Sequence, residues 1–445
     1  MSFSKNILTL SILAIASSTT FAEEEAKVQQ LATIEIKAHP LERNAADFAV
    51  ADHVVEQKEL TEKSVTLGDA LAGEMGIHTN QFGAGSSRPV IRGQDGARIK
   101  VLQNASENID VSTLSPDHAV TVDPLLAKKI EVIQGPSTLL YGAGTVGGLV
   151  NVTDSKIPTQ MPENGYEGNV GLRYNTGSDE KLATAGVTVG LGDQVALRLE
   201  GLKREANDYI APDYFHEGEK ERRVDNTFAK GQTINVGLSW IYDRGFTGIS
   251  YSNRQDQYGL PGHSHEYESC HLQGLSLHCG NHEPNDAHNA GPWIDLKSER
   301  YDVRTELDNP FAGFKKLRAQ ASYTDYQHDE IEEETIVTRF KNKGYDGRLE
   351  LVHNPLGAWE GVIGTQYGQQ KLELTGEEAF LAPNTTNKWS VFALEHAQLN
   401  DVHVELAARA DQQKINIDDA TKKDFDGSAF SVSGAANWEF APNYK

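Results

Sequence analysis

Hydrophobic and polar positions alternate along most of the chain after about residue 163, as in VALRLEGLK and KLRAQASYTDY. Alternation with a period of two residues predicts β-strands whose two faces meet different surroundings. No pattern of helical period competes with it in this part of the chain. We expect strands near 166–176, 182–191, 195–207, 232–242, 246–257, 298–308, 315–331, 336–353, 359–374, 387–399, 401–415 and 427–440.

The residues before this point follow a different pattern, in which short apolar runs alternate with many glycines. They predict a small α+β domain with short helices near 66–75 and 123–128. Short strands are expected near 89–92, 98–102, 129–134 and 148–153.

The lengths of the links between the expected strands distinguish an outer-membrane barrel from a soluble β-fold. Long links at 208–231, 258–297, 375–386 and 416–426 alternate with short ones such as GDQ, DRG and ND. The links 177–181 and 332–335 are exceptions, because they are short where the alternation requires long ones. Alternating long and short links are typical of outer-membrane barrels. The expected fold is therefore mainly β, with an α+β plug domain inside an antiparallel transmembrane β-barrel.

The N-terminus predicts export. Lys5 precedes a short apolar run, Ile7 to Ile15, and Thr20-Phe21-Ala22 offers a cleavage site after Ala22. We expect a signal peptide at 1–22, a periplasmic leader at 23–50, a plug domain at 51–160 and part of a barrel at 161–445. The chain stops at NWEFAPNYK, in or just after a strand, so we expect a truncated piece of a longer protein, with an unusual twelve-strand barrel as the alternative. A net charge of −23 argues against a nucleic-acid partner.

Three stretches of the first domain resemble the plug of TonB-dependent outer-membrane receptors: TLGDALAGEMGIHTN, RPVIRGQDGARIKVL and SPDHAVTVDPLLAKKIEVIQGPSTLLYGAGTVGGLVNV. LATIEIKA resembles their TonB box, here Thr33, Ile34, Glu35, Ile36 and Lys37, although an ordinary first strand would look the same. The resemblance implies a barrel of about 22 strands, a location in the outer membrane among lipid and lipopolysaccharide, and energy from the TonB–ExbB–ExbD complex.

Within that family the chain is most similar to the zinc-uptake receptors of the ZnuD type. The similarity lies in SPDH, GLPGHSHEYESCHLQGLSLHCGNHE and YQHDEIEEETIVTRFKNKGYDGRLELVHNP. It implies active import of zinc across the outer membrane, with zinc as the transported ligand.

One long link gathers the soft metal ligands of the chain. It holds His263, His265, His271, His278, His282 and His288 together with both cysteines, Cys270 and Cys279. Imidazole suits zinc, copper and nickel, so we expect this link to capture ions outside the cell. The cysteines would add thiolates if reduced or close a disulfide if oxidised, and an oxidising exterior favours the disulfide. The alternative is a solvated polar loop.

A second group of ligands is expected inside the receptor. Asp117 and His118 follow a Ser-Pro pair on a turn of the plug. His328 and Glu330 share one face of a strand with Tyr326 and Glu332, whereas Asp329 faces the other way. We expect Asp117, His118, His328 and Glu330 to hold one zinc ion between plug and barrel. The alternative is a solvated or capping role for each pair.

Other functions remain open from the sequence. A receptor for haem or another metal chelate would use the same architecture, and a surface scavenger would use the histidine-rich link alone. An enzyme is not expected, because the chain has no H-E-x-x-H, G-x-S-x-G or P-loop motif.

Overall fold

The structure is a computed structural model. It describes residues 41, 53–62, 65–142, 145–216, 219–261, 271–274, 276–278, 291–332, 334–376, 379–438 and 440. All of these residues lie in one compact unit, Ile36–Lys445.

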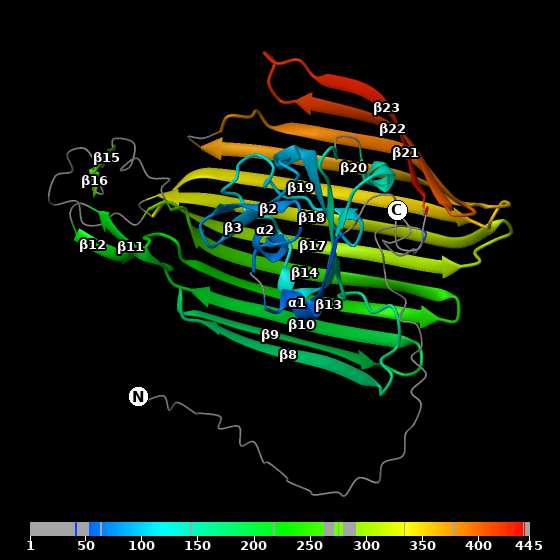
Figure 1. Ribbon diagram of the computed structural model, residues 1–445, viewed down its shortest axis with the longest axis horizontal. Helices are drawn as coiled ribbons and strands as arrows, with labels where there is room; N and C mark the ends of the chain where they lie inside the picture. The colour runs from blue at the N-terminus through cyan, green and yellow to red at the C-terminus, as the bar shows by residue number, and fades with distance from the viewer. Residues whose placement is uncertain are drawn as a thin grey trace, which may run out of the picture. The chain divides into compact units, whose positions relative to one another are not determined.

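Twelve antiparallel strands form one large sheet, and strands that follow one another in the chain are neighbours in it (Figure 1). They are β8 (Tyr166–Asn175), β9 (Glu180–Gly190), β10 (Val195–Ala206), β13 (Ala229–Tyr242), β14 (Gly245–Gly259), β17 (Trp293–Asp308), β18 (Phe314–Glu332), β19 (Thr335–His353), β20 (Trp359–Gly376), β21 (Asn384–Leu399), β22 (Val402–Ile417) and β23 (Phe425–Trp438). Each lies within a few residues of its expected position. The predicted fold class is confirmed.

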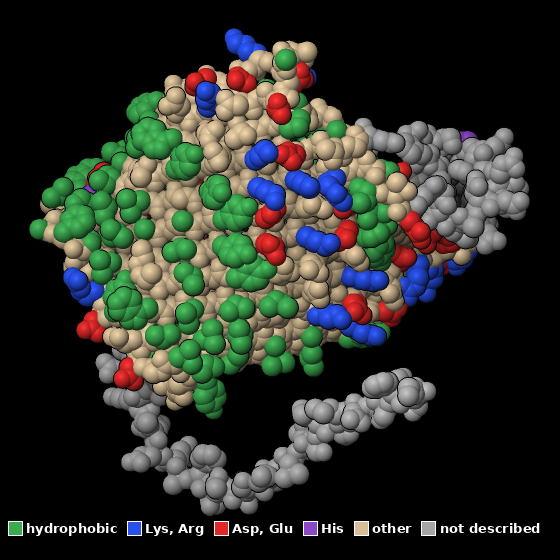
Figure 2. Space-filling view, turned by 180° about the vertical axis from the view of Figure 1, so that it is seen from behind, with side chains coloured by type: hydrophobic (Ala, Val, Ile, Leu, Met, Phe, Trp, Pro, Cys, Tyr) green, Lys and Arg blue, Asp and Glu red, His purple; other side chains and the backbone are tan. Residues whose placement is uncertain are grey.

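The two faces of this sheet differ as the alternating pattern requires. Apolar side chains gather on the outer face (Figure 2), including the exposed Leu199, Ile234, Leu238, Ile249, Val303, Leu349, Ile363, Val391, Leu406 and Val432. Four tyrosines on neighbouring strands, Tyr251, Tyr301, Tyr323 and Tyr345, form a continuous row of ring contacts. An apolar outer band bordered by aromatic rings is the lipid-facing surface of a membrane barrel.

Charged pairs continue the outer face beyond the tyrosine row. Lys343 lies 2.7 Å from Asp325, and Lys203 lies 3.2 Å from Glu205. Figure 2 shows Lys, Arg, Asp and Glu side chains, in blue and red, gathered on one side of the apolar band. Because charges are costly on a lipid-facing surface, the strands extend past the bilayer at this end.

The two ends of the sheet are joined by links of different length. We call the end with the links 207–228 and 260–292 the long-link end, and the end with the turns 191–194, 243–244 and 400–401 the short-link end. Both long links contain strands at the left of Figure 1: β11 (Ile210–His216), β12 (Glu219–Arg223), β15 (His271–Gln273) and β16 (Ser276–His278). These four form a small sheet in the order β12-β11-β16-β15.

This small sheet gives regular structure to part of the histidine-rich link, although no strand was expected between residues 258 and 297. His271 is the backbone partner of His278, and Phe215 pairs with Ser276 in parallel orientation. No alternation of apolar and polar residues marks these three-residue strands, which form by pairing with a hairpin from another link. His263, His265, His282 and His288, both cysteines, the signal peptide and the TonB-box-like stretch lie outside the described residues.

The plug domain lies against the inner face of the barrel sheet (Figure 1). Its elements are β1 (His53–Glu56), α1 (Gln57–Leu60), α2 (Leu67–Leu71), β2 (Ile77–Phe82), β3 (Ser86–Ile91), η2 (Gly96–Arg98), β4 (Ile99–Gln103), β5 (Ser106–Glu107), η3 (Pro124–Leu126), β6 (Ala127–Ile133), η4 (Pro136–Tyr141) and β7 (Gly148–Asp154). The expected strands are present, while the two expected helices are shorter than predicted. Among the described residues, no helix is long and apolar enough to cross a bilayer.

The plug is held together by its own apolar core. Fully buried Leu60, Leu71, Ile91, Ile130 and Val150 belong to one hydrophobic cluster. Three of the plug strands that cover this core, β6, β7 and β4, are neighbours in a five-stranded sheet. The plug therefore presents a rigid body from which short loops reach the barrel wall.

Candidate metal site

Three metal-ligating side chains meet where the plug contacts the barrel wall. His118 comes from the plug segment between β5 and η3, and His328 and Glu330 come from the last part of β18. One donor atom from each lies within 4.8 Å of the other two, and no other such group occurs among the described residues. We call His118, His328 and Glu330 the histidine cluster. The sequence named all three, together with Asp117.

The alternation of β18 places its two ligands on the inner face. Tyr326, His328 and Glu330 are all buried at spacings of two residues. The register with β19 shifts between Glu330 and Ile331, so the regular alternation ends there. Glu332, which the sequence placed on the same face, is not part of the cluster.

A turn brings His118 to this strand. The backbone N–H of His118 donates to the carbonyl oxygen of Ser115 at 3.3 Å. The hydroxyl of Tyr258 on β14 donates to the carbonyl of Asp117 and accepts from the N–H of Ala119, each at 3.0 Å. Two hydrogen bonds to one barrel tyrosine thus fix the turn on both sides of His118. No sequence pattern identified Tyr258 for this role.

The hydrogen bonds of His118 point one nitrogen at the cluster. Its Nδ1 lies 3.1 Å from the carbonyl oxygen of Val111, which can only accept, so Nδ1 carries a proton. Its Nε2 lies 3.2 Å from Oε1 of Glu330. A carboxylate also only accepts, so this contact requires either a proton on Nε2 or a metal ion shared by both atoms. A proton and a metal ion therefore compete for this position.

The pKa of His118 is raised above its ordinary value of 6.5. Burial alone would lower it, but the hydrogen bond to Glu330 and the charge of Asp117 outweigh burial. Without metal, His118 and Glu330 accordingly form a buried ion pair.

One ring nitrogen of His328 has no hydrogen-bond partner among the described residues and faces the carboxylate of Glu330. Its Nδ1 lies 2.6 Å from the hydroxyl of Tyr326, while its Nε2 is buried and has no hydrogen-bond partner among the described residues. This Nε2 lies 3.8 Å from Oε1 of Glu330. A buried polar atom without a partner is costly, and a bound cation would satisfy it.

The separations fit a zinc ion after small movements. In a tetrahedral zinc site with bonds of about 2.0–2.1 Å, neighbouring ligand atoms lie about 3.4 Å apart. The distances from Glu330 to the two histidines, 3.2 and 3.8 Å, lie close to this value. The ring of Phe340 lies 4.8 Å from that of His118 and 4.5 Å from that of His328, centre to centre. Apolar packing holds both imidazoles in place.

The other expected ligands lie elsewhere. Asp117 is buried, but its carboxylate accepts from the hydroxyl of Ser115 and it does not belong to the cluster. His271 is exposed on β15 at the long-link end. The structure therefore brings together three of the four ligands expected inside the receptor, and it places His271 away from them in the small sheet.

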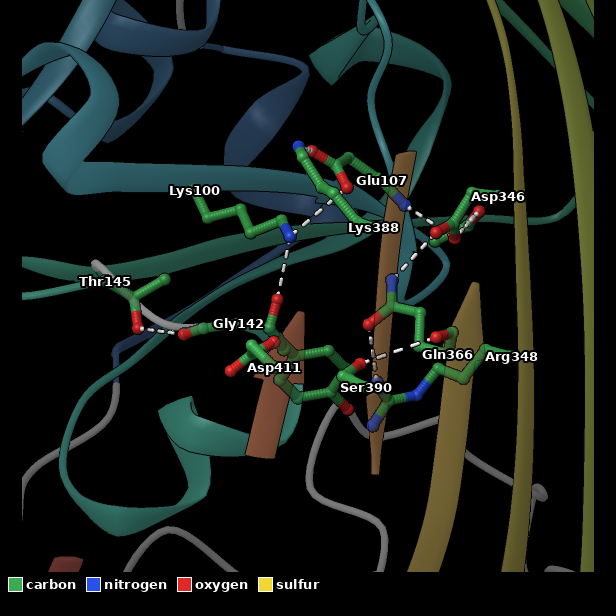
Figure 3. A network of polar contacts seen from close by, with 12 residues as sticks. Lys100, Glu107, Gly142, Thr145, Asp346, Arg348, Gln366, Lys388, Ser390 and Asp411 are labelled. Carbon is green, nitrogen blue, oxygen red and sulfur yellow. Dashed lines mark hydrogen bonds and ion pairs between the residues drawn. The ribbon is translucent and has the colours of Figure 1, made fainter. Parts of the chain in front are cut away.

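A second polar contact between plug and barrel is drawn in Figure 3. It lies closer to the short-link end than the histidine cluster does. Glu107 lies 3.3 Å from Lys100 of the plug and 3.1 Å from Lys388 of β21. Asp346 of β19 accepts hydrogen bonds from the hydroxyl of Ser106 at 2.8 Å and the N–H of Glu107 at 3.1 Å. We call Lys100, Glu107, Asp346 and Lys388 the Glu107 network.

The charges of this network are matched. Burial would raise the pKa of Glu107, but the two lysines outweigh it and hold the pKa at about 2. The sequence did not single out any of these four residues, because nothing in their spacing shows that they meet.

Comparison with known families agrees with this architecture. Residues 44–149 match the family model described as TonB-dependent Receptor Plug Domain. The chain is therefore similar to TonB-dependent receptors in its plug domain, and its fold as a whole resembles that of solved outer-membrane transporters.

Among curated relatives, the ferrioxamine B receptor of Salmonella typhimurium is 28% identical over 211 residues, which is 44% of this chain and 28% of the relative. The hemin receptor of Yersinia pestis is 24% identical over 240 residues, or 50% of this chain and 33% of the relative. The matched part thus spans a third or less of these relatives. By name they are receptors rather than enzymes.

Solved structures show the same fold at low identity. The FrpB iron transporter of Neisseria meningitidis superposes with a TM-score of 0.67 at 13% identity, over 88% of this chain and 63% of that one. The copper transporter OprC gives 0.65 at 15% identity, over 86% and 60%.

Proposed function

We propose that this receptor imports zinc across the outer membrane, as the resemblance to zinc-uptake receptors implies. The observation that carries the proposal is the buried Nε2 of His328, which has no hydrogen-bond partner among the described residues and lies close to Glu330 and His118. Two imidazoles and a carboxylate are a ligand set that zinc favours. The proposed energy source is the TonB–ExbB–ExbD complex, acting on the TonB-box-like stretch Thr33–Lys37.

The proposed order of events uses both ends of the molecule. The histidine-rich link would face the exterior, capture zinc and raise its local concentration. The ion would then displace the proton between His118 and Glu330. Because His118 belongs to the plug while His328 and Glu330 belong to the barrel, movement of the plug would break the ligand set and release the ion inward.

Another cargo, haem or a metal chelate, is the second candidate, since relatives carry the names ferrioxamine and hemin receptor. The burial of the cluster favours a bare ion. His118 is 2% exposed and His328 0%, so neither offers an open face to a flat macrocycle. A deletion strain should fail to grow under zinc chelation and grow normally under iron limitation if the cargo is zinc.

Calorimetric titration of the intact, purified receptor tests the site itself. The six histidines of the link are replaced by alanine so that only internal sites respond. His118→Ala and Glu330→Gln should each weaken zinc binding by more than about 100-fold, exceeding the 10–100-fold typical of groups that only support a ligand. The double variant should lose less than the sum, because both residues bind one ion.

Glu332→Gln is the matched control, since it removes a carboxylate two residues away that lies outside the cluster. It should leave zinc affinity unchanged. Strictly additive losses would indicate two separate sites. Unchanged affinity in both single variants would remove the cluster from the mechanism.

A further inference from the structure

A second group of metal-ligating side chains lies on the inner face of the barrel at the short-link end. Glu360 of β20, His396 of β21 and Glu405 of β22 stand directly opposite one another in the sheet register. His403 lies two residues before Glu405 on the same face of β22. We call these four residues the exit group.

The exit group is separate from the Glu107 network. The adjacent inner-face row, Val362, Leu394 and Ala407, belongs to an apolar cluster that also contains Phe392. Arg348 and Arg409 lie over the ring of Phe392, with their guanidinium carbons 4.1 and 5.6 Å from its centre. This apolar and cationic layer lies between the two polar groups.

The geometry of the exit group suits a transition-metal ion. Side chains directly opposite in an antiparallel sheet have their Cβ atoms about 4.5–5.5 Å apart, so both glutamates flank the imidazole of His396. The rings of His396 and His403 are 5.6 Å apart, centre to centre. Two imidazoles that share a tetrahedral zinc ion have their ring centres about 5 Å apart.

Burial distinguishes this group from a solvated rim. His396 is 1% exposed and Glu405 is 6% exposed. The Nδ1 atom of His403 is enclosed and has no hydrogen-bond partner among the described residues. His396 and Glu405 thus place a buried imidazole beside a buried carboxylate, a pair that a shared proton or a shared cation stabilises, while His403 and Glu360 are half-buried.

We infer that Glu360, His396, His403 and Glu405 form a second binding site for a divalent transition-metal ion at the short-link end of the barrel. Its donor atoms are more widely spread than those of the histidine cluster, the only described group within 4.8 Å. The glutamates must therefore turn to close on an ion, and the exit group binds more weakly than the histidine cluster.

The position of the exit group gives it a role, which rests on the function proposed above. The short-link end faces the periplasm in that orientation, so a weaker site there would receive the ion after the plug moves and pass it on. Leu41, the described residue nearest in sequence to the TonB-box-like stretch, packs in the apolar cluster with Val362 and Leu394. A pull on the leader would thus act one row away from the exit group.

Cobalt binding to the intact receptor tests the inference. The six link histidines are replaced by alanine, and His118→Ala and Glu330→Gln remove the histidine cluster, so that only the exit group can respond. Cobalt(II) reports tetrahedral coordination through its visible absorption, and zinc should displace it. We expect one bound equivalent, lost in the further double variant His396→Gln/His403→Gln. His353→Gln is the matched control. His353 lies at the same end but faces outward on β19, and it pairs with Glu395, 3.1 Å away, which faces outward on β21.

Absence of tetrahedral cobalt before the last substitutions, or its persistence after them, would overturn the inference. Should the variants fail to fold, crystals of the unaltered receptor soaked in zinc decide the question by anomalous scattering. A peak at the exit group supports the site, and a peak at the histidine cluster alone refutes it. Cobalt binding without zinc uptake in cells would leave the metal site standing and remove the proposed transport function.

Discussion

The two polar contacts between plug and barrel differ in whether they are complete without a ligand. In the Glu107 network, one carboxylate meets two lysines, and Asp346 accepts from Ser106, the N–H of Glu107 and, at 2.7 Å, Gln366. In the histidine cluster, one carboxylate faces two imidazoles, and the buried Nε2 of His328 has no hydrogen-bond partner within the part of the chain that the structure describes.

This difference distinguishes a contact that stabilises the position of the plug from one that can bind a ligand. A satisfied polar network fixes its elements in one arrangement, whereas a partly satisfied one is costly until something completes it. The Glu107 network therefore holds the resting plug whether or not an ion is bound. In the proposed mechanism, the histidine cluster adds its full strength only when a cation replaces the proton between plug and barrel.

Removal of the Glu107 charge should have the largest effect on stability. Glu107→Gln leaves two lysines beside an uncharged partner, and breaking a buried pair costs about 3–5 kcal/mol. We expect the lower end, about 3 kcal/mol, because the side chain of Lys388 is 38% exposed. Thermal unfolding and proteolysis of the plug measure this, and zinc affinity at the histidine cluster should stay the same. A parallel loss of zinc affinity would show that the two contacts are not independent.

Low pH should remove the contribution of Glu107 to the free energy of unfolding, because its carboxylate becomes protonated. The pKa of Glu107 is lowered to about 2, below its ordinary value near 4.5, so its stabilising effect is present above pH 4.5 and disappears as the pH falls through about 2. The difference in unfolding temperature between the unaltered receptor and Glu107→Gln should be constant from pH 7 to 5 and shrink below pH 4.5. A constant difference down to pH 2 would contradict the charge-based role.

The hydroxyl that orients His328 should matter for metal and little for the fold. Tyr326→Phe removes the partner of Nδ1, and loss of such supporting groups weakens metal affinity by about 10–100-fold. Calorimetric zinc titration measures the change. Tyr323→Phe, on the outer face of the same strand, is the control and should bind zinc as tightly as the unaltered receptor.

The smallest effect is expected from Asp117→Asn. Its carboxylate accepts from Ser115 rather than joining the cluster, so it acts on His118 only through its field, and we expect less than a roughly tenfold loss of zinc affinity. A loss as large as that of His118→Ala would restore Asp117 as a ligand and revise the set of three to four.

Much of the cluster was predictable because two of its members lie on one strand. Alternation alone places His328 and Glu330 on the inner face, and the parity of the links places them at the long-link end. The contribution of His118 came from a resemblance and not from spacing. Glu332 was assigned to the same face because a register shift beside Glu330 leaves no trace in the alternation.

The sequence by itself determined the twelve strands, their order and the polarity of their faces, since each depends on residues close in the chain. Only the tertiary structure decided which plug residues meet the wall, how Tyr258 fixes the turn of His118, and that Glu107 lies between two lysines. The bond between Ser106 and Asp346 spans 240 residues of sequence. Contacts of that kind are set by how the plug packs against the barrel sheet, and no local pattern of residues encodes them.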